Sequence, residues 1–249
     1  MAPKQYVNAL LLEQYMVIFL HGTLLNTEDL YTVGTSRVLS KYGKGPLTWD
    51  IKLDLQGRPG PEATRRLLAA YGITDVTPEE YIQQAAVELH KLWPTSDWLD
   101  GALPLLEYLK EKKVPVALGT GSNMANYKLK TDRLANHFEL FKHHVVTGDD
   151  SRIPPGRGKP CPDIWHICLE SLNKEREAQG LERITIEECL VFEDGIPGVL
   201  SGTNANATVI WVPHPGALAE MNGKEIEILN GGGEILKSLA DFDPSKYGL

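Results

Sequence analysis

The chain has 249 residues, of which 42% are hydrophobic and 23% are charged, a composition typical of globular proteins. Its 25 Lys and Arg residues against 33 Asp and Glu residues give a formal net charge of -8, which repels nucleic-acid phosphates and anionic membranes. We therefore expect a protein that binds neither nucleic acid nor membranes. Its three cysteines lack the spacing of a disulfide framework or a zinc site, which favours a reducing compartment and a cytoplasmic or nucleocytoplasmic protein.

The first predicted element is a buried strand over residues 16–20, a short run of apolar side chains. The next predicted strand begins only at residue 114, and the segment between them is far too long for a single crossover. Helical patterns within that segment cover residues 28–41, 61–71 and 78–92, separated by turn-rich breaks. We therefore predict an all-helical cap domain at residues 32–98, inserted into a core domain made of residues 1–31 and 99–249.

Strand and helix patterns alternate after the insertion. In chain order we expect a helix over residues 102–113, strands over 114–118 and 144–147, a helix over 163–179, a strand over 189–192, a helix over 196–204 and a strand over 208–212. This order predicts an α/β fold, a Rossmann-like doubly wound parallel sheet with right-handed crossovers. Such sheets bind ligands at the carboxyl ends of their strands, where the helical cap would act as a lid.

Two segments carry groups that suit an anion. Residues 119–123 form a small turn after the second predicted strand, and the amides and the Thr120 hydroxyl could hold a phosphate with Ser122 beside them. Lys159 follows Gly158 and precedes two prolines and a helix start, which fix its position. Taken singly, each feature is also compatible with an ordinary loop or a solvated surface lysine.

A pair of acidic residues ends the strand predicted at residues 189–192. Glu193 and Asp194 are adjacent like charges next to an apolar strand, an arrangement that is costly without a cation. This favours a metal site, although Asp194 could instead cap the following helix.

Together these residues resemble the motifs of the haloacid dehalogenase superfamily, and the resemblance covers essentially the whole chain. It places Thr120 in the second motif, Lys159 in the third and the Glu193–Asp194 pair in the fourth, with a helical cap inserted after the first motif. The segments Leu-Leu-Asn-Thr-Glu at residues 24–28 and Thr-Gly-Asp-Asp at residues 147–150 are most similar to the pseudouridine-5'-phosphatase branch. Sugar-phosphate phosphatases and β-phosphoglucomutase are next in similarity.

The first motif departs from the family pattern, which is Asp-x-Asp-Gly-Thr. Gly22 and Thr23 set the alignment, so Phe19 stands at the position of the nucleophile and His21 at that of the general acid/base. The first aspartate of the chain is Asp29. Phenylalanine has no lone pair to attack phosphorus, so the phosphoaspartyl route is closed. A phosphorylated His21 would need the arginine-rich surroundings of histidine phosphatases, which this sequence lacks.

The leading hypothesis is therefore a pseudophosphatase that binds a phosphorylated small molecule or a protein partner through Thr120, Ser122 and Lys159. Magnesium binding at Glu193 and Asp194 would be weak or absent, because a main carboxylate ligand is missing. The alternative is an active magnesium-dependent phosphatase for a small sugar or nucleoside phosphate, which requires that the first motif is misread or engineered. A structural interaction module is the third possibility.

The cap turn at residues 56–60 is predicted to face the cleft, because the resembled family selects substrates with this loop. Gly57 and Arg58 are its candidate ligand contacts, since a guanidinium suits phosphate or polar sugar groups.

Overall fold

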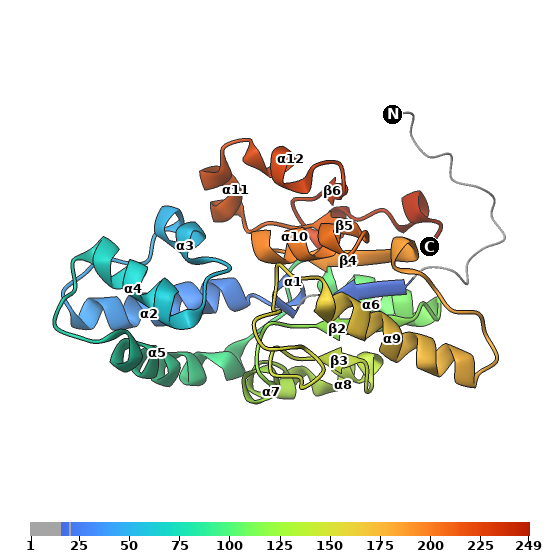
Figure 1. The fold of residues 1–249 in the computed structure, drawn as a ribbon, viewed down its shortest axis with the longest axis horizontal. Coiled ribbons are helices and arrows are strands. Elements are labelled where there is room, and N and C mark those ends of the chain that lie inside the picture. Colours follow the sequence, from blue (N-terminus) through green and yellow to red (C-terminus); the bar gives the residue numbers. More distant parts are fainter. Residues whose placement is uncertain (1–15, 20) are drawn as a thin grey trace.

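The computed structural model describes residues 16–19 and 21–249, with residues 16–19 and residue 21 described by their backbone alone. A six-stranded parallel sheet forms the centre of the core domain (Figure 1). Its strands are β1 (Met16–Phe19), β2 (Val116–Gly119), β3 (Val145–Val146), β4 (Cys189–Glu193), β5 (Thr208–Trp211) and β6 (Gly233–Ile235). The spatial order β3-β2-β1-β4-β5-β6 confirms the predicted doubly wound fold. Because the order reverses at β1, the ends of β1, β2 and β4 meet where open α/β sheets bind ligands.

Helices cover both faces of the sheet because successive strand residues point to opposite sides. In β4, Leu190 and Phe192 join the core cluster on the α6 face, whereas Val191 joins the cluster beneath α9. The core helices are α1 (His21–Leu24), α6 (Ala102–Glu111), α7 (Met124–Thr131), α8 (Ala135–Phe138), α9 (Asp163–Ala178), α10 (Ile196–Asn204), α11 (Pro215–Met221) and α12 (Lys224–Leu229). Among the described residues, no helix is long and apolar enough to span a membrane.

The five predicted strands are all present, but a sixth was not expected. β6 contains only Gly233, Glu234 and Ile235, so it lacks the apolar run by which the other strands could be recognised. It pairs with β5 in parallel and places Gly233 opposite Val209. A side chain at position 233 would begin 1.8 Å from the Val209 carbonyl oxygen, so the close approach of these strands requires glycine there.

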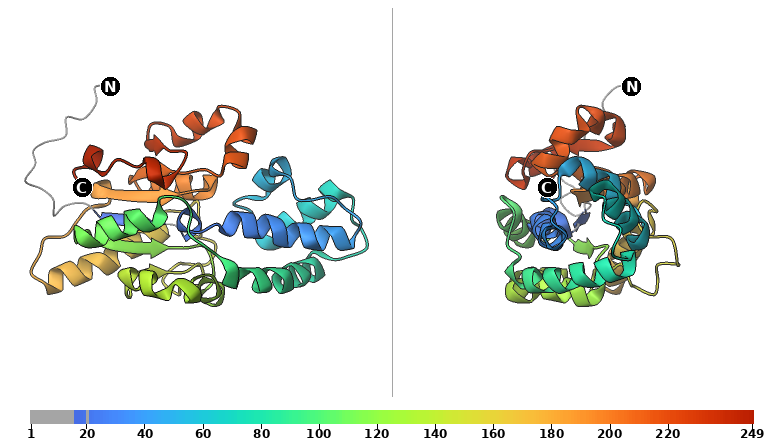
Figure 2. Two further views of the ribbon diagram at one scale, coloured as in Figure 1. Left: turned by 180° about the vertical axis from the view of Figure 1, so that it is seen from behind. Right: turned by 90° about the vertical axis from the view of Figure 1, so that its left-hand side faces the viewer.

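Four helices form the cap, which lies at one end of the core (Figures 1 and 2). They are α2 (Thr27–Lys41), α3 (Trp49–Leu55), α4 (Gly60–Tyr71) and α5 (Pro78–Leu92), and the 3-10 turn η1 (Trp93–Thr95) follows them. The cap has a hydrophobic cluster of its own, formed by Val38, Leu39, Leu47, Leu67, Leu68, Ile73 and Tyr81. The sequence predicted three of these helices; α3 is additional.

The chain enters and leaves the cap through two segments that lie side by side. Leu25 forms an isolated antiparallel bridge with Trp98, and the amide of Asn26 donates to the Asp97 carbonyl at 3.0 Å. α2 begins directly after this pairing, so the predicted boundary between residues 31 and 32 falls inside a continuous helix.

Candidate functional site

One pocket of about 240 Å³ brings together the residues that the sequence singled out from three separate segments. It lies at the carboxyl ends of β2 and β4, and Thr120, Ser122, Lys159, Glu193 and Asp194 all line it. Residues far apart in the chain meet here because parallel strands end at the same edge of the sheet.

Hydrogen bonds hold the turn after β2 in a defined shape. The side chain of Thr120 is buried, and its amide donates to the Val146 carbonyl at 2.8 Å. Its hydroxyl oxygen accepts a bond of 3.1 Å from the Ser122 amide. Asn123 then caps α7 by accepting from the Asn126 amide at 2.8 Å. The turn therefore presents hydroxyl groups from a fixed backbone at the start of a helix.

Lys159 and Glu193 form a buried ion pair. The two charged groups are 2.5 Å apart, and the Lys159 ammonium also donates to the Gly119 carbonyl at 3.3 Å. Burial raises the pKa of Glu193, and the attraction of Lys159 offsets only part of that effect. Gly198 packs against the carboxylate so closely that a side chain there would begin 1.9 Å from Cδ of Glu193. The positive charge of Lys159 is thus largely neutralised by Glu193.

Asp194 is partly buried, and among the described residues its Oδ1 atom is buried without a hydrogen-bond partner. Burial raises its pKa well above the usual value, and the charges of Glu28 and Glu193 add to that effect. Its other oxygen, Oδ2, lies 2.8 Å from the position that a side chain on Gly22 would take. A carboxyl group in this setting requires either a proton or a cation.

The described donors fit a magnesium ion only in part. Asp194 offers a free carboxylate oxygen, but Glu193 is already paired with Lys159. Magnesium commonly binds through one or two carboxylates and takes its other ligands from water and substrate phosphate. An ion held here would therefore depend on the ligand's own phosphate.

The first motif reaches the site through its backbone. The side chains of Phe19 and His21 lie outside the described part of the structure, but β1 ends at Phe19, paired with Leu118 of β2 and Phe192 of β4. Position 19 is therefore the last strand residue beside β4, and residue 21 directly precedes the Gly22 that faces Asp194. The two positions at which the family resemblance expects aspartates, 19 and 21, thus adjoin the pocket.

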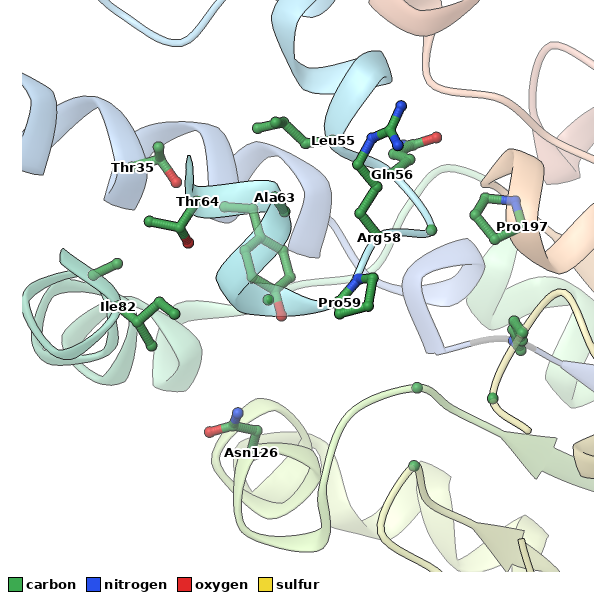
Figure 3. A pocket seen from close by; sticks show the side chains of 18 of the residues that line it. Thr35, Leu55, Gln56, Arg58, Pro59, Ala63, Thr64, Ile82, Asn126 and Pro197 are labelled. Carbon is green, nitrogen blue, oxygen red and sulfur yellow. The ribbon is translucent and has the colours of Figure 1, made fainter. Parts of the chain in front are cut away.

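The cap closes over this pocket and forms a larger cleft with the core, about 1060 Å³ in volume. Gly57, with φ at 74°, packs on Pro197 of the core, 2.9 Å from the position of an added side chain, and it lines the small pocket. The guanidinium of Arg58 is turned toward α3 and Gln56 (Figure 3). It pairs with Asp54 at 3.0 Å and with Glu62 at 3.4 Å. Contact between Arg58 and a ligand therefore stays a prediction.

Lys130 is a pocket residue that sequence reasoning missed. It lies on α7, is only 3% exposed, and lines the small pocket together with Lys159. The local sequence Lys-Leu-Lys-Thr-Asp-Arg is typical of a solvated helix face, so nothing nearby in the chain indicates that one of its lysines is buried.

Comparisons with known proteins agree with this geometry. A family model described as haloacid dehalogenase-like hydrolase matches residues 20–206. A probable pseudouridine-5'-phosphatase of Saccharomyces cerevisiae is 48% identical over 92% of this chain and 94% of its own. The (DL)-glycerol-3-phosphatase 2 of Arabidopsis thaliana is 33% identical over 94% and 91%. The fold resembles a crystal structure of a HAD family hydrolase from Deinococcus radiodurans R1, with a TM-score of 0.72, 23% identity and coverage of 94% and 96%.

Proposed function

Because the chain belongs to the haloacid dehalogenase-like hydrolases, with phosphatases among its relatives, we propose that it is a pseudophosphatase that binds a phosphorylated small molecule without hydrolysing it. The observation that carries this proposal is the end of β1. Phe19 occupies the last position of that strand, between β2 and β4, where an attacking carboxylate would have to stand. The segment 16–22 contains no acidic residue at all.

The missing group decides between binding and hydrolysis. Removing the nucleophile from a hydrolase such as subtilisin lowers turnover by about 10⁶, and phosphate monoesters are among the slowest substrates in water. Phosphate binding depends on other groups, and these are present in one pocket: the Thr120 hydroxyl, the Ser122 hydroxyl and the Lys159 ammonium. We propose these three as the phosphate donors.

Magnesium would take part in binding only. A bound magnesium ion would supply positive charge that neutralises phosphate. Asp194 would supply its unpartnered oxygen, while Glu193 holds Lys159 in place. The closed cap would exclude water and enclose the remainder of the ligand in the larger cleft.

The likeness to the yeast probable pseudouridine-5'-phosphatase supports a second candidate. In this view, the protein is an active phosphatase for a small sugar or nucleoside phosphate, and its natural first motif differs from residues 19–21 as written. A third candidate, an interaction module with an unused cleft, predicts neither turnover nor phosphate binding.

Two measurements on the intact chain separate these candidates. We expect no turnover of p-nitrophenyl phosphate or nucleoside monophosphates with magnesium, but a rise in melting temperature with inorganic phosphate, since a ligand at 100 times its Kd stabilises by about 2.7 kcal/mol. Calorimetry should show that Thr120→Val weakens phosphate binding. Turnover of about 1 per second, which is at the low end of the usual range for enzymes, would establish the second candidate. No turnover together with no binding would leave the interaction module.

A further inference from the structure

Lys130 is the only described lysine of the small pocket that forms no ion pair with a carboxylate. The pocket holds two lysines, and Lys159 is paired with Glu193 at 2.5 Å. Lys130 has no carboxylate oxygen within 4.0 Å in the described part of the chain. Its ammonium instead donates to the Ser122 hydroxyl at 2.9 Å.

Aromatic rings complete the surroundings of this ammonium. It lies 4.1 Å from the ring centroid of Trp93 and 5.0 Å from that of Tyr31, at the base of the cap. Contacts of this kind offset only part of the free energy that burying an ion costs. A buried cation without a counter-ion therefore lowers the stability of the folded protein.

The nearby acidic groups do not remove that cost. Glu28 is paired with Lys52 at 2.9 Å, and Asp194 attracts Lys130 only at longer range. Desolvation outweighs both attractions and lowers the pKa of Lys130 from 10.5 to about 8. Tyr31, the other titratable group beside it, has a pKa raised to about 12 and stays neutral.

The position of Lys130 shows where a counter-ion would fit. Its partner Ser122 is bonded through the backbone to the Thr120 hydroxyl, and both residues line the same pocket as Lys130. An anion next to Thr120 and Lys159 would thus lie beside Lys130, whose ammonium has no carboxylate partner among the described residues. We propose that Lys130 is a ligand-binding residue that supplies the counter-charge for an oxyanion, such as the phosphate group of the ligand, in this pocket.

This inference rests on the proposed phosphate site and goes beyond it, because it assigns the main counter-charge to a helix residue outside the motif positions Thr120, Lys159, Glu193 and Asp194. It also gives the binding a pH dependence. Lys130 must be protonated to bind an anion, so affinity should fall as the pH rises through about 8. Within the described residues, Glu28, Asp194 and Tyr31 are the titratable groups that interact with it, and Lys159 lines the same pocket.

The test compares Lys130→Met with Lys128→Met, an exposed lysine on the same helix. Calorimetry with inorganic phosphate and with sulfate, which stays a dianion throughout, is run at about pH 7 and about pH 9, and the melting temperature is measured without ligand. We expect Lys130→Met to weaken binding of both anions at least tenfold at the lower pH, while its own melting temperature is unchanged or higher. Lys128→Met should behave like the parent.

A purely structural role for Lys130 predicts the opposite pattern: a lower melting temperature and affinities within about twofold of the parent. That result would overturn the inference. If Lys130→Met does not fold, the parent decides the question by itself, because sulfate affinity that is equal at both pH values would also contradict it. If the parent binds neither anion, the proposed function fails first and this inference fails with it. If the parent binds and the Lys130 variant binds equally, only the inference fails.

Discussion

The indole of Trp49 in the cap stacks on the imidazole of His214 in the core, with ring centroids 4.4 Å apart and planes 22° from parallel. Gly216 lies against the same indole, so closely that a side chain there would begin 2.2 Å from it. His214 also pairs with Asp29 of α2 at 3.0 Å. These contacts connect α3 to the start of α11 and hold the cap against the core.

Replacing Trp49 should therefore loosen the closed cap. Aromatic pairs contribute about 0.5–1.5 kcal/mol beyond the area that they bury, so we expect Trp49→Ala to weaken binding of a phosphorylated ligand by roughly 3- to 10-fold. Trp49→Phe keeps an aromatic ring and should lose less. Hydrogen exchange of the amides in α3 provides the measurement, together with ligand affinity. Unchanged exchange and unchanged affinity in the alanine variant would show that the stacking does not hold the cap.

Restoring the first motif should restore hydrolysis. Phe19→Asp combined with His21→Asp would return a nucleophile, a proton donor and a metal ligand beside Asp194, and these groups act together. We expect the double variant to hydrolyse phosphomonoesters well above background, and either single variant to do far less. Steady-state assays with magnesium measure this, with Asp194→Asn added as the control that should abolish the gain. A folded double variant with no activity on a broad panel would favour the interaction module.

Removing the partner of Glu193 should be costly. Lys159→Met leaves a buried carboxylate without compensation, which we expect to lower the free energy of unfolding by about 3–5 kcal/mol. Adding Glu193→Gln should recover much of that loss, because the remaining pair is neutral. Denaturant unfolding of the parent, both single variants and the double variant forms a complete cycle. Independent, additive effects would mean that the 2.5 Å contact contributes little.

The same Lys159→Met variant should respond to pH in a defined direction. The fold already raises the pKa of Glu193 above the value in the unfolded chain, and loss of Lys159 raises it further. Above the unfolded pKa, the folded state then binds more protons than the unfolded state, so its stability falls as pH rises. This fall should be steeper in the variant than in the parent. Equal slopes between about pH 5 and pH 8 would contradict it.

Lys130 gives a pH dependence of the opposite sign. Its pKa is about 8 in the fold against 10.5 for an ordinary lysine, so between these values the unfolded state binds more protons and stability rises with pH. Lys130→Met lacks this contribution, and we expect it to exceed the parent in stability by at most about 3 kcal/mol at neutral pH. The difference should shrink as pH rises through the folded pKa. Unfolding curves of both proteins over this range provide the measurement, and a constant difference would argue against a charged Lys130.

The sequence predicted the parts of the fold that depend on local pattern. β4 and β5 are apolar runs with branched residues, and α10 begins and ends at the predicted residues, 196 and 204. β6 could not be predicted in this way, because its pairing with β5 depends on the absence of a side chain at Gly233 rather than on a pattern of its own.

The candidate site was predictable to the extent that strand ends can be located. Thr120, Glu193 and Asp194 follow recognisable strands, and parallel strands bring their ends together. Two features depend on the tertiary structure instead. Lys130 becomes a pocket residue only because α7 packs beneath Trp93, and Arg58 meets Asp54 and Glu62 only through the path of the cap turn.

The pairing of Leu25 with Trp98 also bears on how this architecture can be altered. Because the chain leaves the core and returns to it at adjacent backbone positions, the intervening segment is topologically a large loop with closely spaced ends. Such a segment can be shortened or replaced by another domain without changing the order in which the core strands pair. The inserted helices line the larger cleft, so the proposed selection of ligands there can diversify independently of the sheet that carries the small pocket.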